Sequence, residues 1–289
     1  MQAIILAAGY GVRLRPYTDF RPKPLFPVLN QPLLHRLLGQ LRMCGCRSVV
    51  VNCHHLAEQI KAELAVWPDA LIQHEPILLG TGGSLRLALD RLENEPVLVM
   101  NGDLYHEIDL ERVYRHHLLS KNSVTLALHD YPRFNNVGIK GDRVRSFGAD
   151  AGRQLAFTGI QVVDPEMIER VPADRFHHII DLYRELAPQG RIGFFRVDGA
   201  CWRDIGTPTD YLDLHRELLV GQSNWLVDPG ARIGSDVVLA EWGCIGAGAV
   251  IGAGAYLCRS VVWDGAVVAP GNVVTDRIIT GHPVSEERA

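Results

Sequence analysis

The residues best suited to chemistry lie near the start of the chain, directly after a short apolar run. Gly9 and Gly11 follow this run, and glycines let a backbone bend sharply and bring its N–H groups close to an oxyanion. Two cations come next, Arg13 and Lys23, and Lys23 stands between two prolines that restrict the local backbone. A glycine turn followed by an arginine and a proline-flanked lysine is suited to gripping a polyphosphate.

Two carboxylates farther along the chain could hold a metal ion against such a polyphosphate. Asp103 follows the apolar run 96–100, and Asp204 stands about a hundred residues later in the string WRDIGTP. Mg²⁺ usually binds through one or two carboxylates together with phosphate oxygens and water. The competing interpretation of Asp103 is an ordinary turn aspartate after a glycine.

The glycine turn does not match the two most familiar phosphate-binding motifs. Leu14 occupies the position where a dinucleotide-binding fingerprint needs its third glycine for helix packing. No Gly-Lys-Ser/Thr string follows, which excludes a Walker A loop.

Alternating strands and helices are expected to position these groups. Apolar runs predict strands at 3–6, 47–52, 70–74 and 96–100, and helical patterns cover 32–43, 55–66 and 81–91. This alternation is typical of an α/β domain with a parallel sheet, whose ligands bind at the carboxyl ends of the strands. From 123 to 197, several strands joined by short turns predict a mixed extension of the sheet.

The last part of the chain has a period of six. Apolar residues recur at every sixth position, and glycine follows at 234, 246 and 252: Val227, Ile233, Leu239, Ile245, Ile251, Leu257, Trp263 and Ala269, with Thr275 last. Such a period is the mark of a parallel β-helix of about three coils. The pattern predicts two domains, residues 1–221 and 222–289.

Residues 6–28 read L-A-A-G-x-G-x-R-L-x-P-x-T and then P-K-P-L-x-P-V, which resembles the signature of sugar-1-phosphate nucleotidyltransferases. These enzymes join a nucleoside triphosphate to a sugar 1-phosphate and release pyrophosphate. The hexad segment resembles the left-handed hexapeptide-repeat domains that many of them carry. The resemblance implies a Rossmann-like mixed, mainly parallel sheet with flanking helices, followed by a short left-handed parallel β-helix.

The resemblance also implies roles for individual residues. Arg13 would contact the leaving β,γ-phosphates, and Lys23 the α-phosphate or the leaving oxygen. Asp103 and Asp204 would share the Mg²⁺ ion. The remaining substrate-binding positions would be those of the first loop (Leu6, Ala7, Ala8, Gly9, Gly11), the nucleobase loop (Glu75, Gly80, Thr81) and the sugar pocket (Gly138, Thr158, Gly159).

The identities of the base and the sugar stay open. Glu75 favours GTP slightly, because a carboxylate only accepts hydrogen bonds and guanine offers two adjacent donors. The repeat segment and the string GTPTDYL resemble mannose-1-phosphate guanylyltransferases. However, no Glu-Lys-Pro motif lies between Arg143 and Thr158, a feature similar to N-acetylmuramate-1-phosphate uridylyltransferases. Arg153 or Arg203 could replace the missing sugar-phosphate lysine.

The first interpretation is therefore a Mg²⁺-dependent enzyme that uses GTP with mannose 1-phosphate or a similar hexose phosphate. The alternative within the class is UTP with an amino-sugar 1-phosphate such as N-acetylmuramate 1-phosphate. The alternative from another class is a non-catalytic nucleotide-binding scaffold. An acyltransferase built on the hexad segment is disfavoured, because residues 225–275 contain no histidine.

Composition limits the partners. The net charge of −4 disfavours a nucleic-acid binder. No run of about 20 apolar residues is present, so no membrane span is expected. Strand residues begin at once without a basic leader, which favours a cytoplasmic protein. The repeat segment is expected to mediate self-association into a homo-oligomer.

Overall fold

The computed structural model describes residues 1–148, 152–221 and 223–282. The chain divides into two compact units: unit 1 consists of Met1–Gly9 and Leu37–Trp202, and unit 2 of Tyr10–Arg36 and Arg203–Ala289. The predicted domain boundary at residue 222 and the chain end 283–289 lie outside the described residues, as do residues 149–151 of the segment that lacks the lysine motif. The two-domain division at that boundary stays a prediction. Two elements, α1 (Leu33–Met43) and β13 (Trp202–Asp204), run across the division between the units.

Unit 1 is built around a nine-stranded sheet of order β5-β4-β1-β6-β11-β8-β12-β10-β9. The strands are β1 (Gln2–Leu6), β4 (Ser48–Cys53), β5 (Ala70–His74), β6 (Val97–Asn101), β8 (Val124–His129), β9 (Val137–Lys140), β10 (Arg143–Phe147), β11 (Gln154–Val163) and β12 (Ile192–Arg196). The sheet is mixed as expected, but the expectation that it is mainly parallel is wrong, because the strands after β6 pair mostly antiparallel. Parallel pairing is confined to the β5-β4-β1-β6 half and the β8–β12 pair, whereas β11 is antiparallel to β6, β8 and β9.

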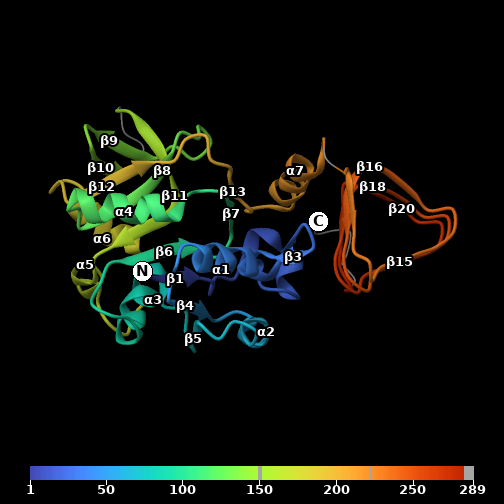
Figure 1. Cartoon of the computed structure of the whole chain (residues 1–289), viewed down its shortest axis with the longest axis horizontal. Helices are drawn as coiled ribbons and strands as arrows, with labels where there is room; N and C mark the ends of the chain where they lie inside the picture. Colours follow the sequence, from blue (N-terminus) through green and yellow to red (C-terminus); the bar gives the residue numbers. More distant parts are fainter. Residues whose placement is uncertain (149–151, 222, 283–289) are drawn as a thin grey trace. The chain divides into compact units, whose positions relative to one another are not determined.

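The helices of unit 1 flank this sheet (Figure 1). They are α2 (Ala57–Leu64), α3 (Gly80–Ala88), α4 (Leu110–Ser120), α5 (Pro165–Glu169) and α6 (Ile179–Leu186), with a 3₁₀ turn η4 (Leu89–Arg91) and a short strand β7 (Leu104–His106) between them. The Asp109 carboxylate caps α4 by accepting a hydrogen bond from the Arg112 N–H at 3.0 Å.

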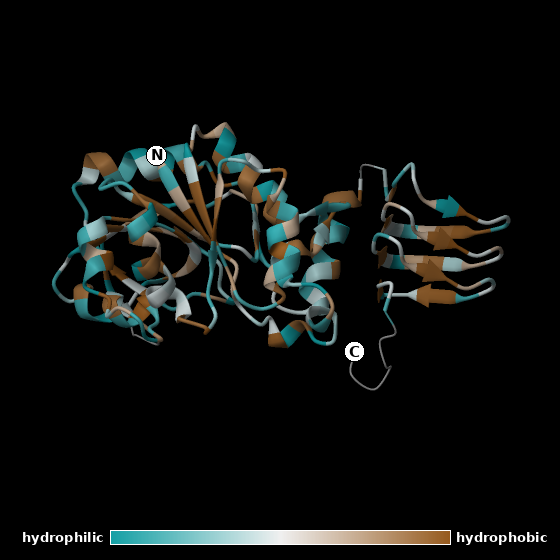
Figure 2. Ribbon diagram, turned by 90° about the horizontal axis from the view of Figure 1, so that it is seen from below, coloured by the Kyte–Doolittle hydropathy of each residue, from teal (hydrophilic) through white to brown (hydrophobic). Residues whose placement is uncertain are grey.

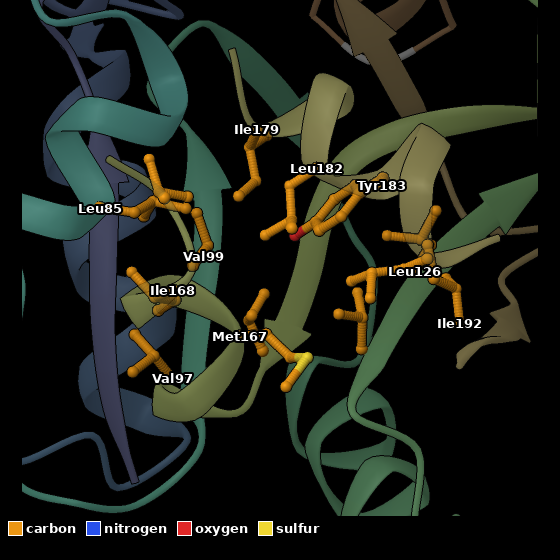
Figure 3. Close-up of a cluster of buried hydrophobic side chains, with 14 of the residues drawn as sticks. Leu85, Val97, Val99, Leu126, Met167, Ile168, Ile179, Leu182, Tyr183 and Ile192 are labelled. Carbon is orange, nitrogen blue, oxygen red and sulfur yellow. The ribbon is translucent and has the colours of Figure 1, made fainter. Parts of the chain in front are cut away.

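Helices α3, α5 and α6 bury an apolar face against strands β6, β8 and β12 (Figure 3). Removal of this apolar surface from water is the main force that holds the helices on the sheet. The side chains that form the centre of this cluster are Leu85, Val97, Val99, Leu126, Met167, Ile168, Ile179, Leu182, Tyr183 and Ile192.

Unit 2 begins with three 3₁₀ turns, η1 (Val12–Leu14), η2 (Tyr17–Asp19) and η3 (Lys23–Leu25), and a small hairpin of β2 (Pro27–Val28) and β3 (Gln31–Pro32). Helix α7 (Pro208–Leu219) follows β13. The remaining strands are short and parallel: β14 (Trp225–Val227), β15 (Arg232–Ile233), β16 (Val238–Ile245), β17 (Val250–Ile251), β18 (Tyr256–Val262), β19 (Val267–Val268), β20 (Val273–Thr275) and β21 (Ile278–Ile279).

These short strands stack one above another (Figure 2). Val250 pairs with Arg232 earlier in the chain and with Val267 later in it, and the second spacing is shorter than the first by one position. Of the predicted column, Ile245, Ile251 and Leu257 are buried, whereas Val227 and Ile233 are 37% and 41% exposed. Beyond Leu257 the predicted phase is wrong. The buried residues that follow are Val262, Val268 and Val274, each one position before the predicted Trp263, Ala269 and Thr275. The sequence pattern could not show this slip, because Val262 and Trp263 are both apolar.

No helix among the described residues is long and apolar enough to cross a membrane.

Candidate active site

In unit 1, the first loop and the Asn101–Asp103 turn meet at one edge of the sheet. Strands β1 and β6 are parallel neighbours, so their carboxyl ends lie at the same edge. The Gly102 N–H donates a hydrogen bond to the Leu6 carbonyl oxygen at 2.8 Å. Asp103, directly after this turn, is partly exposed. Leu6 and the Asn101–Asp103 turn therefore lie beside each other at this edge of the sheet.

The turn before Asp103 leaves no room for a side chain at residue 102. A Cβ added to Gly102 would lie 2.9 Å from the Leu6 carbonyl oxygen, a backbone atom that cannot rotate away. We therefore expect Gly102→Ala to lower the free energy of unfolding by about 1–3 kcal/mol and to reduce activity by moving Asp103. Gly39→Ala is the matched control, because no atom lies within 4 Å of its added Cβ. Urea unfolding of both variants checks this, and equal stabilities would contradict it.

The first loop is held by a buried asparagine that the sequence analysis missed. The Ala7 N–H donates to Asn52 Oδ1 at 2.6 Å, and Asn52 Nδ2 donates to Glu75 Oε1 and to Ser84 Oγ, both at 2.9 Å. Asn52, Glu75 and Ser84 are all buried. The sequence feature that could have indicated this role is the position of Asn52, a polar residue at the end of an apolar strand. This network joins the first loop, which is expected to bind phosphates, to the expected nucleobase loop.

The Glu75 carboxylate accepts hydrogen bonds from neighbouring groups of the protein. Its side chain is 0% exposed, and Oε1 also accepts from Gln73 Nε2 at 3.1 Å, while Oε2 accepts from the Leu79 N–H at 3.4 Å. A carboxylate buried among these donors holds the loop 75–79 in place. The reading of the base by Glu75, and the preference for GTP drawn from it, stay predictions.

The glycine-rich start of α3 packs against protein backbone. A Cβ on Gly80, whose φ is +70°, would lie 2.8 Å from the His177 carbonyl oxygen. The Gly82 N–H donates to that same oxygen at 2.8 Å, and Thr81 Oγ1 accepts from the Ile179 N–H at 3.0 Å. Because Gly80 and Gly82 have no Cβ, the backbone of residues 177–179 packs closely against the start of α3.

The predicted sugar-pocket residues lie on β9 and β11. A Cβ on Gly159, with φ +79°, would lie 2.7 Å from Asn101 Nδ2, so this position adjoins the Asn101–Asp103 turn. Thr158 is fully buried, and its hydroxyl donates to the Ala127 carbonyl oxygen at 2.8 Å. Gly138 pairs with Gln154 in the sheet. Gly159 thus lies beside the Asn101–Asp103 turn, whereas the Thr158 hydroxyl is hydrogen-bonded to the backbone of the neighbouring strand β8.

In unit 2, a tight turn presents the first cation. Gly11 has φ +61°, and a Cβ there would lie 2.8 Å from Thr18 Cγ2. Its carbonyl oxygen accepts from the Leu14 N–H at 2.9 Å and from Thr18 Oγ1 at 3.1 Å. Only glycine fits this left-handed, crowded position. The turn leaves the Arg13 side chain 62% exposed.

Arg13 and Lys23 converge on Asp204. Lys23 Nζ lies 3.4 Å from Asp204 Oδ1, and Arg13 Nη2 lies 3.6 Å from Asp204 Oδ2. The Lys23 and Asp204 side chains are only 7% and 17% exposed. A Cβ on Gly206 would lie 2.9 Å from both Arg13 Nη1 and Asp204 Oδ2. The structure thus brings together three of the predicted residues, with two cations on one carboxylate.

Two further predictions concern cations and metal. Arg203, a candidate for the missing sugar-phosphate cation, donates from Nε and Nη2 to Glu217 Oε2 at 2.9 and 2.7 Å. Arg153, the other candidate, is exposed.

Within the described residues, no group of three or more His, Cys, Asp or Glu side chains is placed to hold a metal ion. Asp103 belongs to unit 1 and Asp204 to unit 2, so their sharing of one ion stays a prediction.

Comparison with known proteins identifies the family. The family described as Nucleotidyl transferase matches residues 2–220. The chain is similar to a mannose-1-phosphate guanylyltransferase of Mycobacterium tuberculosis, with 30% identity over 300 residues, 95% of this chain and 83% of that protein. It is also similar to an N-acetylmuramate alpha-1-phosphate uridylyltransferase of Neisseria meningitidis, with 33% identity over 218 residues, 72% of this chain and 94% of that protein.

Among solved structures, HddC from Yersinia pseudotuberculosis complexed with GMP-PN is similar, with a TM-score of 0.64 and 25% identity, over 75% of this chain and 99% of that chain. The mixed α/β fold is therefore that of nucleotidyltransferases. The chain belongs to the nucleotidyl transferase family, and it is a sugar-1-phosphate nucleotidyltransferase, an enzyme that joins a nucleoside triphosphate to a sugar 1-phosphate.

Proposed function

We propose that the chain uses GTP and mannose 1-phosphate, or a similar hexose 1-phosphate, and releases the GDP-sugar and diphosphate. The observation that carries the choice of substrates is the extent of the similarity to the mannose-1-phosphate guanylyltransferase. That similarity covers 95% of this chain and so extends into the C-terminal repeats, whereas the uridylyltransferase similarity covers 72%. The observation that carries the reaction is the convergence of Arg13 and Lys23 on Asp204.

In the proposed reaction, a phosphate oxygen of the sugar 1-phosphate attacks the α-phosphorus of the nucleotide, and diphosphate leaves as the bond to the β-phosphate oxygen breaks. Such a reaction needs positioning and counter-charge more than covalent catalysis. We assign Lys23 to the α-phosphate or the leaving oxygen, and the more exposed Arg13 to the β,γ-phosphates. The backbone from Leu6 to Gly11, with Ala8 and Gly9 at its centre, would follow the phosphates.

We propose that Asp103 and Asp204 hold Mg²⁺. The donor set fits this ion, because both side chains are carboxylates and Mg²⁺ prefers oxygen ligands, with phosphates and water completing its shell. When bound, the ion would neutralise charge on the phosphates. Asp204 already lies against Arg13 and Lys23, so a metal ion at Asp204 would put its positive charge beside both cations and favour a polyphosphate among them.

The test is diphosphate release in the presence of Mg²⁺, with GTP, UTP, ATP and dTTP each paired with a panel of sugar 1-phosphates. The panel contains mannose, glucose, N-acetylglucosamine and N-acetylmuramate 1-phosphates. The proposal expects the highest kcat/KM for GTP with mannose 1-phosphate or another hexose 1-phosphate. A preference for UTP with N-acetylmuramate 1-phosphate would support the alternative instead. Release with no pair would support the non-catalytic scaffold.

We further propose that the stacked strands of unit 2 form a left-handed parallel β-helix, and that it mediates a homo-oligomer. Parallel pairing between positions about three hexads apart supports the first proposal, since three hexads make one coil. An exposed apolar column supports the second. Val238, Tyr256 and Val273 are register partners and are 51%, 37% and 75% exposed. We place the enzyme in the cytoplasm, where its nucleotide substrates are made.

Charge in this column is expected to dissociate the oligomer. The double variant Val238→Glu/Val273→Glu places like charges beside a surface that would otherwise be buried between copies. We expect the variant to sediment as a monomer at concentrations where the unmodified chain sediments as an oligomer. Leu119→Glu is the control, because Leu119 is 77% exposed on α4 of unit 1. Analytical ultracentrifugation checks this, and a monomeric unmodified chain would contradict it.

A further inference from the structure

The slip in the hexad pattern turns one large aromatic side chain away from the stacked strands. Val262 fills the interior position, so Trp263, the next residue, points to the opposite side. Trp263 is nevertheless only 2% exposed. Tyr211 of α7 contacts it, as do Arg21 and Phe26, which lie more than two hundred positions earlier in the chain.

One side of this contact is made by Arg21. Its guanidinium carbon lies 4.6 Å from the centroid of the Trp263 ring. The same guanidinium donates from Nη1 and Nη2 to Asp264 Oδ1 and Oδ2, at 2.6 and 2.9 Å. A bidentate pair of this kind fixes orientation as well as position. Burial raises the pKa of Asp264, but the hydrogen bonds and charge of Arg21 outweigh burial and lower it below its ordinary value.

The other side of the contact is made by Phe26 and by Tyr211, which links Trp263 to Pro27. The Phe26 ring packs edge-on against Trp263, with the centroids 4.8 Å apart. Trp263 Nε1 donates to the Tyr211 hydroxyl at 3.1 Å, and that hydroxyl donates to the Pro27 carbonyl oxygen. Buried aromatic pairs with satisfied N–H and O–H groups are rigid contacts.

Lys23 lies between these two anchors. Arg21 stands two residues before it and Phe26 three residues after it, and both rest on Trp263. The intervening backbone is stiff: Pro22 has φ −66°, and the Leu25 and Phe26 N–H groups donate to the carbonyl oxygens of Pro22 and Lys23 at 2.8 and 3.0 Å. The segment 21–26 is therefore a short arch, fixed at both ends, that carries the ammonium facing Asp204.

We propose that Trp263 and Asp264 are positioning residues for Lys23, so that the C-terminal repeats set the geometry of the phosphate-binding arch. This inference rests on the proposed role of Lys23 in the reaction. Freeing one end of the arch would let the ammonium drift, and a displacement of about 1 Å in a catalytic group can lower the rate by up to a hundredfold. The repeats would thereby contribute to catalysis without touching a substrate.

The chain offers a closely matched pair of variants. Asp264 and Asp276 are 53% and 57% exposed, and each binds one arginine through both carboxylate oxygens. Asp276 binds Arg259, which also contacts Glu241 within the repeats. Asp264→Asn and Asp276→Asn therefore remove the same kind of ion pair, one at the arch and one elsewhere in the stack.

The first measurement is amide hydrogen exchange of peptides that cover residues 17–28. We expect faster exchange of the Leu25 and Phe26 amides in Asp264→Asn and in Arg21→Gln, no added effect in the double variant, and unchanged exchange in Asp276→Asn. This measurement requires no catalytic activity, so it tests the anchoring even if the proposed function fails. Unchanged exchange in Asp264→Asn would overturn the proposal.

The second measurement is steady-state kinetics with the preferred substrate pair. We expect Asp264→Asn to lower kcat by about tenfold with little change in the KM for the nucleotide, whereas Asp276→Asn keeps the original kcat. Melting temperatures serve as the check on stability, since both variants should lose a similar amount. Equal kcat values for the two variants would overturn the proposal, because a contact that only stabilises the fold would affect both alike.

Discussion

Asp204→Asn is expected to lower kcat by about 10²- to 10³-fold, the range seen when one preorganised charged or hydrogen-bonding group is removed from a reaction centre. The change removes the proposed metal ligand. It also removes the counter-charge that holds Lys23 at 3.4 Å and Arg13 at 3.6 Å. Both losses act on the phosphates, so kcat should fall more than nucleotide affinity does.

Asp213→Asn is the control for this variant. Asp213 also pairs with an arginine, Arg216 at 3.0 Å, but on α7 with its side chain 45% exposed. Steady-state kinetics at several Mg²⁺ concentrations, together with calorimetric titration of Mg²⁺ in the presence of nucleotide, checks the result. If Asp204→Asn retained the original kcat and the original Mg²⁺ affinity, the assigned role would be wrong.

Lys23→Met is expected to lower kcat by about a hundredfold, equivalent to about 3 kcal/mol of transition-state stabilisation. Methionine is close to lysine in length and keeps the apolar stem packed, so the loss isolates the ammonium. Lys23→Arg should not restore activity, because a planar guanidinium cannot replace a compact ammonium in a space where lysine is 7% exposed.

Lys61→Met is the matched control, because Lys61 also pairs with a carboxylate, Glu58 at 2.7 Å, on the outer side of α2. Single-turnover measurements separate the chemical step from substrate binding. An unchanged single-turnover rate in Lys23→Met would show that the ammonium takes no part in the reaction.

The sequence predicted those features that follow from local pattern. Alternating strands and helices predicted parallel strands whose carboxyl ends would carry the ligand-binding loops. The pairing of β1 with β6, which brings Gly102 against Leu6, is known only from the structure. Likewise, the motif predicted a sharp backbone turn at Gly11. The positive φ of Gly11 explains why no other residue fits there. The family resemblance supplied the roles of Arg13, Lys23 and Asp204, which the fold then places together.

Other features depend on contacts that no local pattern records. The resemblance implies a base-reading role for Glu75, whereas the hydrogen bonds that it accepts from Gln73, Asn52 and Leu79 can be recognised only once the strands are paired. The slip at Val262 arises because the spacing from Ile245 to its partner Val262 is one position shorter than the spacing from Val227 to its partner Ile245. The sequence could not reveal it, because both phases offered an apolar residue. The contact of Arg21 with Asp264 joins residues 243 positions apart, and a period of six gives no sign of it.

The most direct test of the central claim is a crystal structure of the enzyme with a slowly hydrolysed GTP analogue and Mn²⁺ in place of Mg²⁺, with the ion located by its anomalous scattering. Mn²⁺ accepts the same oxygen ligands. We predict a single ion bound by carboxylate oxygens of both Asp103 and Asp204, at about 2.0–2.3 Å, with Lys23 Nζ facing the α-phosphate. An ion bound by neither aspartate, or Lys23 directed away from the phosphates, would contradict this account.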